Sequence, residues 1–145
     1  MRYLGVLLLA LVAASSAAAQ PMPDPCKLVA DWKLKPALGA KMTHREPHLS
    51  HGARMCEWQS ASSDPYREVS LQVQPLERGL FTAKWNRPIT GVRPVRGVGE
   101  MAYSVNNGEW LVAWRNGIEV TIGTTELKNP LGTATLVAKL ALAHM

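Results

Sequence analysis

The chain of 145 residues has only two cysteines, a single phenylalanine and no block of five or six like charges. The absence of charge blocks argues against a polyionic tail. Its only long apolar run, residues 4–14, is too short to span a bilayer comfortably, and no segment of about 18 apolar residues follows it. We therefore expect no transmembrane anchor.

Motifs that mark common catalytic sites are also absent. The sequence contains no Gly-x-Ser-x-Gly, no His-Glu-x-x-His and no phosphate-binding loop. Residues 97–99 (Gly-Val-Gly) lack the third glycine of a dinucleotide-binding motif and precede a predicted strand, so we interpret them as a turn. Carboxylates are present, but their spacing in the sequence does not show which of them pair in space. We expect a protein that is not an enzyme.

The first 19 residues have the pattern of an export signal. Arg2 precedes the apolar run, and small residues at 15–19 provide an Ala-x-Ala cleavage site. We expect one mature domain, residues 20–145, that is periplasmic or secreted. Removal of 19 residues from 145 leaves 126, and loss of Arg2 reduces 16 basic residues to 15 against 11 acidic ones, a net charge of +4. A basic face would favour anionic surfaces, but this excess is mild and typical of a slightly basic soluble surface. The location argues against a nucleic-acid partner.

In an oxidising compartment, Cys26 and Cys56 can form a disulfide bond. Redox catalysis is the alternative, but it usually employs close cysteines such as Cys-x-x-Cys with a reactive thiolate. A separation of 30 positions does not fit that chemistry. We therefore interpret the pair as structural.

Helices are predicted at both ends of the mature chain, where Asp24-Pro25 and Asn129-Pro130 each place a capping residue before a proline. The first, over 26–38, contains Pro36, which predicts a kink or two short pieces. The last is expected over 130–143. Its predicted buried stripe consists of Leu136, Val137, Leu140 and Ala141.

Strands are predicted between these helices. Residues 54–59 and 68–74 are expected to be strands, and apolar side chains alternate cleanly along the second. Two turns, Asn-Asn-Gly and Asn-Gly, divide 100–123 into three runs typical of an antiparallel meander. Residues 40–52 and 88–99 are expected to be loops, and Pro75 to open a helix. The pattern indicates an α+β fold with helices packed on an antiparallel sheet.

Three of the four histidines lie within eight residues, at His44, His48 and His51. In an extended segment, His44, Glu46 and His48 would point the same way. Imidazole suits zinc or copper. The three histidines and Glu46 are therefore a candidate metal site, with His144 as a distant addition. The alternative is a solvated polar loop that binds no metal.

Five tryptophans against one phenylalanine is an unusual ratio. Trp110 and Trp114 share one face of a predicted strand and are candidates for a ligand or partner surface. Core packing, with each indole N–H finding an acceptor, is the alternative.

Four short motifs resemble, in order, those of a widespread family of small secreted bacterial proteins and lipoproteins of unknown function. They are 24–29 (Asp-Pro-Cys-Lys-Leu-Val), 37–39 (Ala-Leu-Gly), 56–58 (Cys-Glu-Trp) and 97–103 (Gly-Val-Gly-Glu-Met-Ala-Tyr). The resemblance implies a compact α+β fold similar to the sandwich-like fold of the photosystem accessory protein family, and a bridge from the first helix to the first strand. It implies no catalytic residues. Unlike many members, this chain has no lipid-modified cysteine after its signal, and Pro36 interrupts the first helix.

Three functions follow as hypotheses, of which the third is an undetected hydrolase that would need a cleft with paired titratable groups. The first is a non-catalytic periplasmic or secreted binding or accessory module for an envelope protein or a small ligand. The second is a periplasmic zinc- or copper-binding protein that uses residues 44–51.

Overall fold

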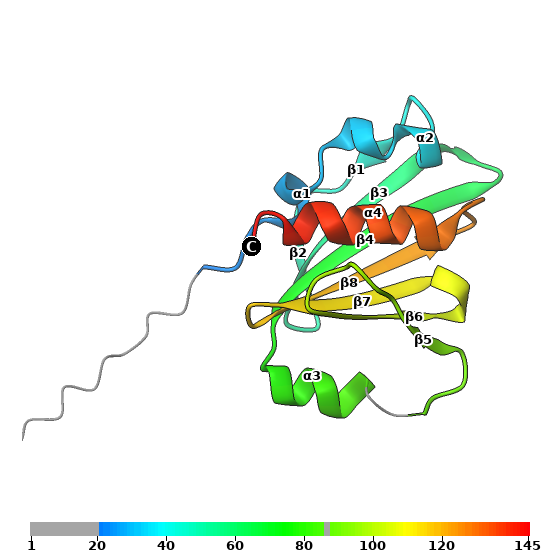
Figure 1. Ribbon diagram of the computed structural model, residues 1–145. Coiled ribbons are helices and arrows are strands. Elements are labelled where there is room, and N and C mark those ends of the chain that lie inside the picture. The colour runs from blue at the N-terminus through cyan, green and yellow to red at the C-terminus, as the bar shows by residue number, and fades with distance from the viewer. Residues whose placement is uncertain (1–20, 86–87) are drawn as a thin grey trace, which may run out of the picture.

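The computed structural model describes residues 21–85 and 88–145, so the predicted export signal lies outside the described residues. These residues form one eight-stranded antiparallel sheet with helices on both faces (Figure 1). The strand order is β1-β3-β4-β8-β7-β6-β5, and β2 also pairs with β3. The predicted α+β class is confirmed.

The strands have the following bounds: β1 (Thr43–His44), β2 (His48–Ser50), β3 (Ala53–Ser63), β4 (Tyr66–Pro75), β5 (Val92–Pro94), β6 (Met101–Val105), β7 (Trp110–Arg115) and β8 (Ile118–Thr125). The helices are α1 (Pro25–Leu28), α2 (Lys35–Leu38), α3 (Arg78–Trp85) and α4 (Pro130–Leu142), with 3₁₀ turns η1 (Asp31–Lys33) and η2 (Asn106–Gly108).

The main core lies between the sheet and α4. Alternate residues of β4 are fully buried, as the sequence pattern predicts, and in the ladder Leu71 lies opposite Cys56 on β3 and Ile122 on β8. Small residues of α4, among them Ala134 and Ala138, are also fully buried. Short side chains let the helix axis approach the sheet closely, which gives a tightly packed interior.

Strand β7 is covered on both faces, as predicted. Leu111 and Ala113 belong to the main core, whereas Val112 and Trp114 pack with Phe81 in a second cluster under α3. This alternation follows from the two-residue period of a strand. Helix α3 therefore protects part of the sheet face opposite α4.

A buried carboxylate connects α3 to the sheet. The side chain of Glu119 on β8 is 0% exposed and accepts hydrogen bonds from Nε2 of Gln74 at 2.5 Å and from Nε1 of Trp85 at 3.4 Å. The Nζ atom of Lys84 lies 3.6 Å from the same carboxylate. A buried charge is tolerated when such partners surround it.

Several expected boundaries are wrong. The loop expected over 40–52 contains β1 and β2, and the loop expected over 88–99 contains β5. Both discrepancies have the same cause, since these short strands exist through pairing with β3 and β6 and not through a local pattern. Pro75 ends β4 and does not open a helix; α3 begins three residues later.

The N-terminal and C-terminal helices follow the capping prediction more closely. Asp24 caps α1, Asn129 caps α4, and the region around Pro36 forms short pieces (α1, η1 and α2) as expected. The buried stripe of α4 differs from the prediction. It consists of Ala134, Val137, Ala138, Ala141 and Leu142, whereas Leu136 is 39% exposed.

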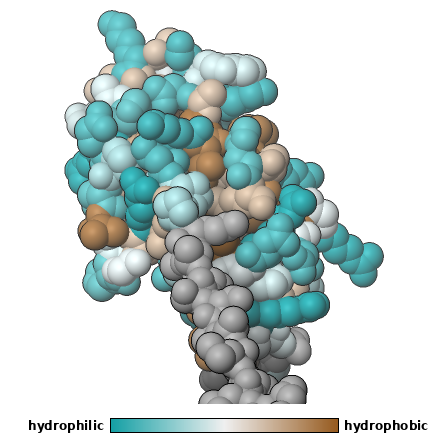
Figure 2. Space-filling view, turned by 90° about the vertical axis from the view of Figure 1, so that its left-hand side faces the viewer, coloured by the Kyte–Doolittle hydropathy of each residue, from teal (hydrophilic) through white to brown (hydrophobic). Residues whose placement is uncertain are grey.

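The predicted disulfide is present and joins Cys26 of α1 to Cys56 of β3. Among the described residues, none of the helices has the length and hydrophobicity that a bilayer crossing requires. Figure 2 shows the end of the molecule that carries α1 and the C-terminus. Its surface is mostly hydrophilic, with hydrophobic residues in a limited central area and one separate spot, as is usual when most large apolar side chains fill a core.

Candidate functional site

Three adjoining hollows surround Arg67 at the other end of the sheet, where the β3–β4 turn, the β8–α4 loop and α2 meet. We call them together the Arg67 hollow. The sheet part has a volume of about 670 Å³, the part between α2 and α4 about 340 Å³, and the part at the β3–β4 turn about 400 Å³. Leu127 and Lys128 line the first two parts, and Pro65 lines the first and third. Of the residues that the structure describes, only Arg67 lines all three.

The position of Arg67 follows from the pleat of β4. It precedes Val69 by two residues, so its side chain leaves the strand on the face that carries the main core. Its backbone N–H donates to Oγ of Ser60 at 3.0 Å, which anchors this end of β4 to β3. Because the core ends here, the side chain extends past it toward α2 and the β8–α4 loop.

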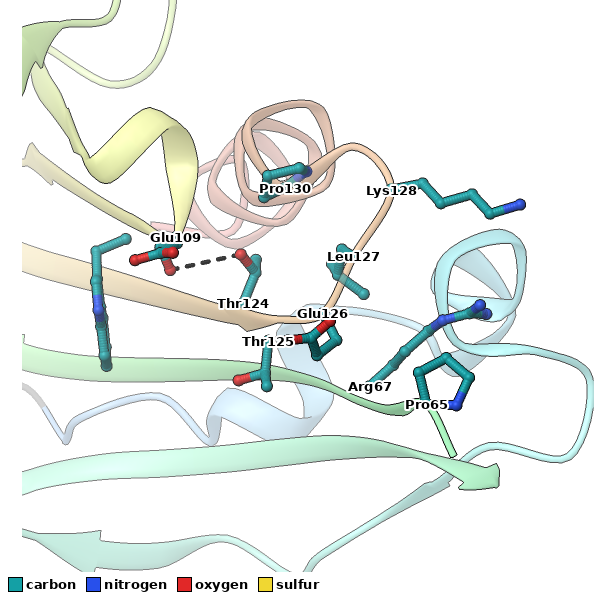
Figure 3. Close-up of a pocket in the computed structure, with 10 residues that line it drawn as sticks. Pro65, Arg67, Glu109, Thr124, Thr125, Glu126, Leu127, Lys128 and Pro130 are labelled. Atoms are coloured by element: carbon teal, nitrogen blue, oxygen red, sulfur yellow. Dashed lines mark hydrogen bonds between the residues drawn. The ribbon is translucent and has the colours of Figure 1, made fainter. Parts of the chain in front are cut away.

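The guanidinium of Arg67 has no protein partner in residues 21–85 and 88–145. No carboxylate there lies within ion-pair distance, and its buried Nε atom has no hydrogen-bond acceptor. In native structures the great majority of buried polar atoms are hydrogen-bonded. Figure 3 shows Arg67 and Lys128 extending to the same side of the β8–α4 loop, with Leu127 between them.

Positive charge dominates the hollow. Its lining contains Lys33, Lys41 and Lys128 besides Arg67, whereas both lining carboxylates, Glu109 and Glu126, belong to the sheet part. Concave surfaces that carry one sign of charge concentrate the electrostatic potential and favour ions of the other sign. The part between α2 and α4 has three cationic side chains and, among the described residues, no carboxylate in its lining.

Apolar side chains form the walls of that part. They are Pro36 and Ala37 of α2, Leu127 of the loop and Leu136 of α4. The exposure of Leu136, which the helical pattern did not predict, has its explanation here, because Leu136 faces the hollow and not the sheet.

The two candidate tryptophans have different environments. Trp114 is buried under α3, and its Nε1 donates to the carbonyl oxygen of Leu76 at 2.7 Å. Trp110 is 44% exposed and lines the sheet part of the Arg67 hollow. Its ring lies against Gly123 of β8, where a Cβ atom would be only 2.9 Å from Cζ3. Only Trp110 of the two therefore borders the hollow.

The candidate metal ligands make separate contacts. Nδ1 of His44 lies 3.1 Å from Oδ2 of Asp31, Nδ1 of His48 is 3.4 Å from the carbonyl oxygen of Glu46, and Nδ1 of His51 is 3.2 Å from Oγ of Ser50. In the described ranges, no three histidine, cysteine or acidic side chains gather closely enough to hold a metal ion. Zinc or copper binding by residues 44–51 would thus require the segment to rearrange, and it stays a prediction.

The contact of His44 belongs to a short chain of hydrogen bonds. The other carboxylate oxygen of Asp31 accepts from Nε1 of the fully buried Trp58 at 3.0 Å. Asp31 therefore connects η1 to β3 and orients His44 of β1. This accounts for Asp31, Trp58 and His44 as parts of the local structure.

Sequence reasoning missed Arg67, although a signal was present. Residues 67, 69, 71 and 73 share one strand face, and three of them are buried aliphatic residues. A cation at the first position of an apolar series is an inconsistency that merits a functional explanation.

Comparison with protein-family models, curated proteins and solved structures gives no match for this chain. Its motif resemblance to small secreted bacterial proteins therefore stays a prediction, and the site must be interpreted from its own geometry.

Proposed function

We propose that this chain is an exported, non-catalytic binding module that holds its ligand in the Arg67 hollow. The observation that carries the proposal is the guanidinium of Arg67, which has no protein partner among the described residues and borders all three parts of the hollow. A buried donor without an acceptor costs about 1–3 kcal/mol. Nε itself is enclosed by protein, so a ligand in the hollow would pair with the outer nitrogens of the guanidinium, for which no protein acceptor is present among the described residues.

The lining supports binding and not chemistry. Within the described residues it includes no histidine or cysteine. Ser60 and Ser62 donate their hydroxyl protons to the carbonyl oxygens of Ser62 and Asp64, each at 2.9 Å, so neither hydroxyl has an adjacent base that would activate it. The ligand is a small molecule or a segment of an envelope protein.

Export is supported by the signal-like sequence of residues 1–19 and by the disulfide between Cys26 and Cys56. Disulfides persist mainly in oxidising compartments. The proposed location is the periplasm or the cell exterior.

The test is a screen of the mature, disulfide-bonded protein against a library of acidic, basic and neutral fragments by two-dimensional amide NMR. The proposal is supported by compounds that shift the amide signals of Arg67, Leu127 and Lys128 together. The substitution Arg67→Gln is expected to weaken the binding of these compounds. Arg93→Gln is the matched control because Arg93 is exposed on β5, away from the hollow lining. A library that leaves those three signals unchanged would contradict the proposal.

A further inference from the structure

We infer that the ligand of this hollow is an amphipathic anion, whose carboxylate or phosphate group binds Arg67 and whose apolar body lies between α2 and α4. The inference rests on the proposed function and adds the chemical class of the ligand. It comes from two properties of the same part of the hollow, its charge and its walls.

The charge selects an anion. Arg67, Lys33 and Lys128 line this part together, without a carboxylate in its described lining. A guanidinium presents paired N–H donors that match the two oxygens of a carboxylate or phosphate. Lys33 is partly buried and its Nζ lies 4.0 Å from the ring centroid of Trp32, so this second cation is held in place at the rim.

The walls select an apolar body next to that anionic group. Pro36, Ala37, Leu127 and Leu136 form a lining of aliphatic carbon. Leu131 and Leu136 of α4 are 37% and 39% exposed, but of these two only Leu136 lines this part of the hollow, and it loses water contact when a ligand covers it. The volume of about 340 Å³ lies at the lower end of the range of small-molecule sites.

Other ligand classes fit less well. A metal cation would meet three like charges in this part of the hollow. A neutral polar ligand would leave the guanidinium uncompensated and the aliphatic walls in contact with polar groups. A small inorganic anion would neutralise the charge but would leave the apolar walls in water.

The test compares four probes by isothermal titration calorimetry on the mature, disulfide-bonded protein: octanoate, octyl phosphate, octanol and inorganic phosphate, each below any micelle-forming concentration. The two amphipathic anions are expected to bind at least about tenfold more tightly than octanol or inorganic phosphate, as loss of a charge-assisted hydrogen bond or of an apolar contact predicts. Their affinity falls as salt is raised.

Two variants separate the contributions. Arg67→Gln is expected to weaken octanoate about tenfold or more, while Leu136→Ser weakens octanoate but leaves inorganic phosphate unchanged. Arg93→Gln and Leu80→Ser are the controls, since Leu80 is 58% exposed on α3 and lies outside the hollow lining. Both control variants are expected to bind octanoate as the unaltered protein does.

Each contrary result has a definite meaning. Equal affinity for octanol and octanoate would overturn the claim that the ligand needs an anionic group. Equal affinity for inorganic phosphate and octyl phosphate would overturn the claim that it needs an apolar body. Neutral fragments that shift the signals of Arg67, Leu127 and Lys128 when octanoate does not would overturn this inference and leave the proposed function intact. Binding to phosphatidylglycerol vesicles that Arg67→Gln does not weaken, without octanoate binding, would identify a membrane surface instead and also overturn it.

Discussion

Arg67 occupies a strand position where the neighbouring residues on the same face, Val69 and Leu71, are fully buried aliphatic side chains. Its long methylene stem can lie along apolar surface while the guanidinium stays at the rim of the core. Nε has no acceptor in residues 21–85 and 88–145, so this buried donor opposes stability. Functional sites often carry such a cost in stability.

This interpretation predicts opposite effects of one substitution at two arginines. Arg67→Met is expected to raise the free energy of unfolding by about 1 kcal/mol, because it removes a buried donor that has no acceptor. Arg54→Met is expected to lower it by about 1 kcal/mol, because Nη1 of Arg54 donates to the carbonyl oxygen of Met22 at 2.8 Å. Urea unfolding of both variants measures the difference. A loss of stability in Arg67→Met as large as that in Arg54→Met would contradict the interpretation.

Tyr66, next to Arg67 in the sequence, provides a test at alkaline pH. Partial burial, followed by the hydrogen bond that its hydroxyl donates to Glu68 and the charge of Glu68, raises the pKa of Tyr66 from 10.0 to about 12. The folded protein therefore holds this proton more tightly than the unfolded chain does. The resulting stabilisation is complete below pH 10 and is lost as the pH rises from 10 to about 12.

The phenolate absorbance of Tyr66 is the direct measurement, with Tyr66→Phe used to separate its signal from that of Tyr103. Glu68→Gln is expected to lower the pKa of Tyr66 toward its ordinary value, because the substitution removes the negative charge. Titration of Tyr66 near pH 10 in the unaltered protein would show that the contact with Glu68 does not persist in solution.

At the scale of elements, α3 depends on one buried side chain. Glu119→Ala leaves Nε1 of Trp85 and Nε2 of Gln74 without their acceptor under the helix. We expect a loss of about 2–3 kcal/mol of stability, with faster amide exchange over 78–85 than in the central ladder of β4 and β8. Hydrogen exchange measured by mass spectrometry gives this comparison.

The control for Glu119→Ala is Glu46→Ala, which makes the same substitution at an exposed carboxylate. It is expected to change stability by less than about 0.5 kcal/mol. If Glu119→Ala had an equally small effect, the packing of Phe81 and Trp114 alone would account for the position of α3.

The start of α4 and its buried face show how the elements form the hollow. Asn129 caps the helix by accepting from the backbone N–H of Gly132 at 3.1 Å, which fixes where the β8–α4 loop stops. Alanines then bury one helical face against the sheet, so Leu136 is turned toward α2. The hollow is thus a consequence of where two helices of unequal length meet beside the end of the sheet.

At the scale of the whole molecule, the disulfide closes a loop of the chain that includes α2, η1 and two edge strands. Its chain-entropy contribution is about 3–4 kcal/mol for a separation of 30 residues. The double variant Cys26→Ser, Cys56→Ser is expected to lose stability of this size in denaturant unfolding. Because Lys33, Pro36 and Ala37 lie inside the closed loop, ligand affinity is expected to fall as well.

Reduction of the unaltered protein is the control, since it breaks the same bond without a substitution. It should reproduce both effects. A stability that is insensitive to reduction would mean that the main core between the sheet and α4 holds α1 and α2 without the bridge.

The sequence by itself determined what depends on neighbouring residues. The alternation along 69–73 defined a strand, the Asn-Gly turns defined the meander of β6, β7 and β8, and Asp24 and Asn129 defined where helices start. These features follow from backbone sterics, capping and period, which act over a few residues. The cysteine count and the resemblance to secreted proteins also indicated the bridge.

Only the tertiary structure decided the site. The Arg67 hollow combines residues of η1 and α2, the start of β4, and the loop before α4, which lie from about thirty to about a hundred positions apart in the sequence. The packing of these segments decides which face α4 presents to the sheet and how exposed Leu136 is. It also leaves Arg67 without a partner in the described part of the chain. Local patterns carry no information about such contacts, because side-chain packing between distant segments selects them.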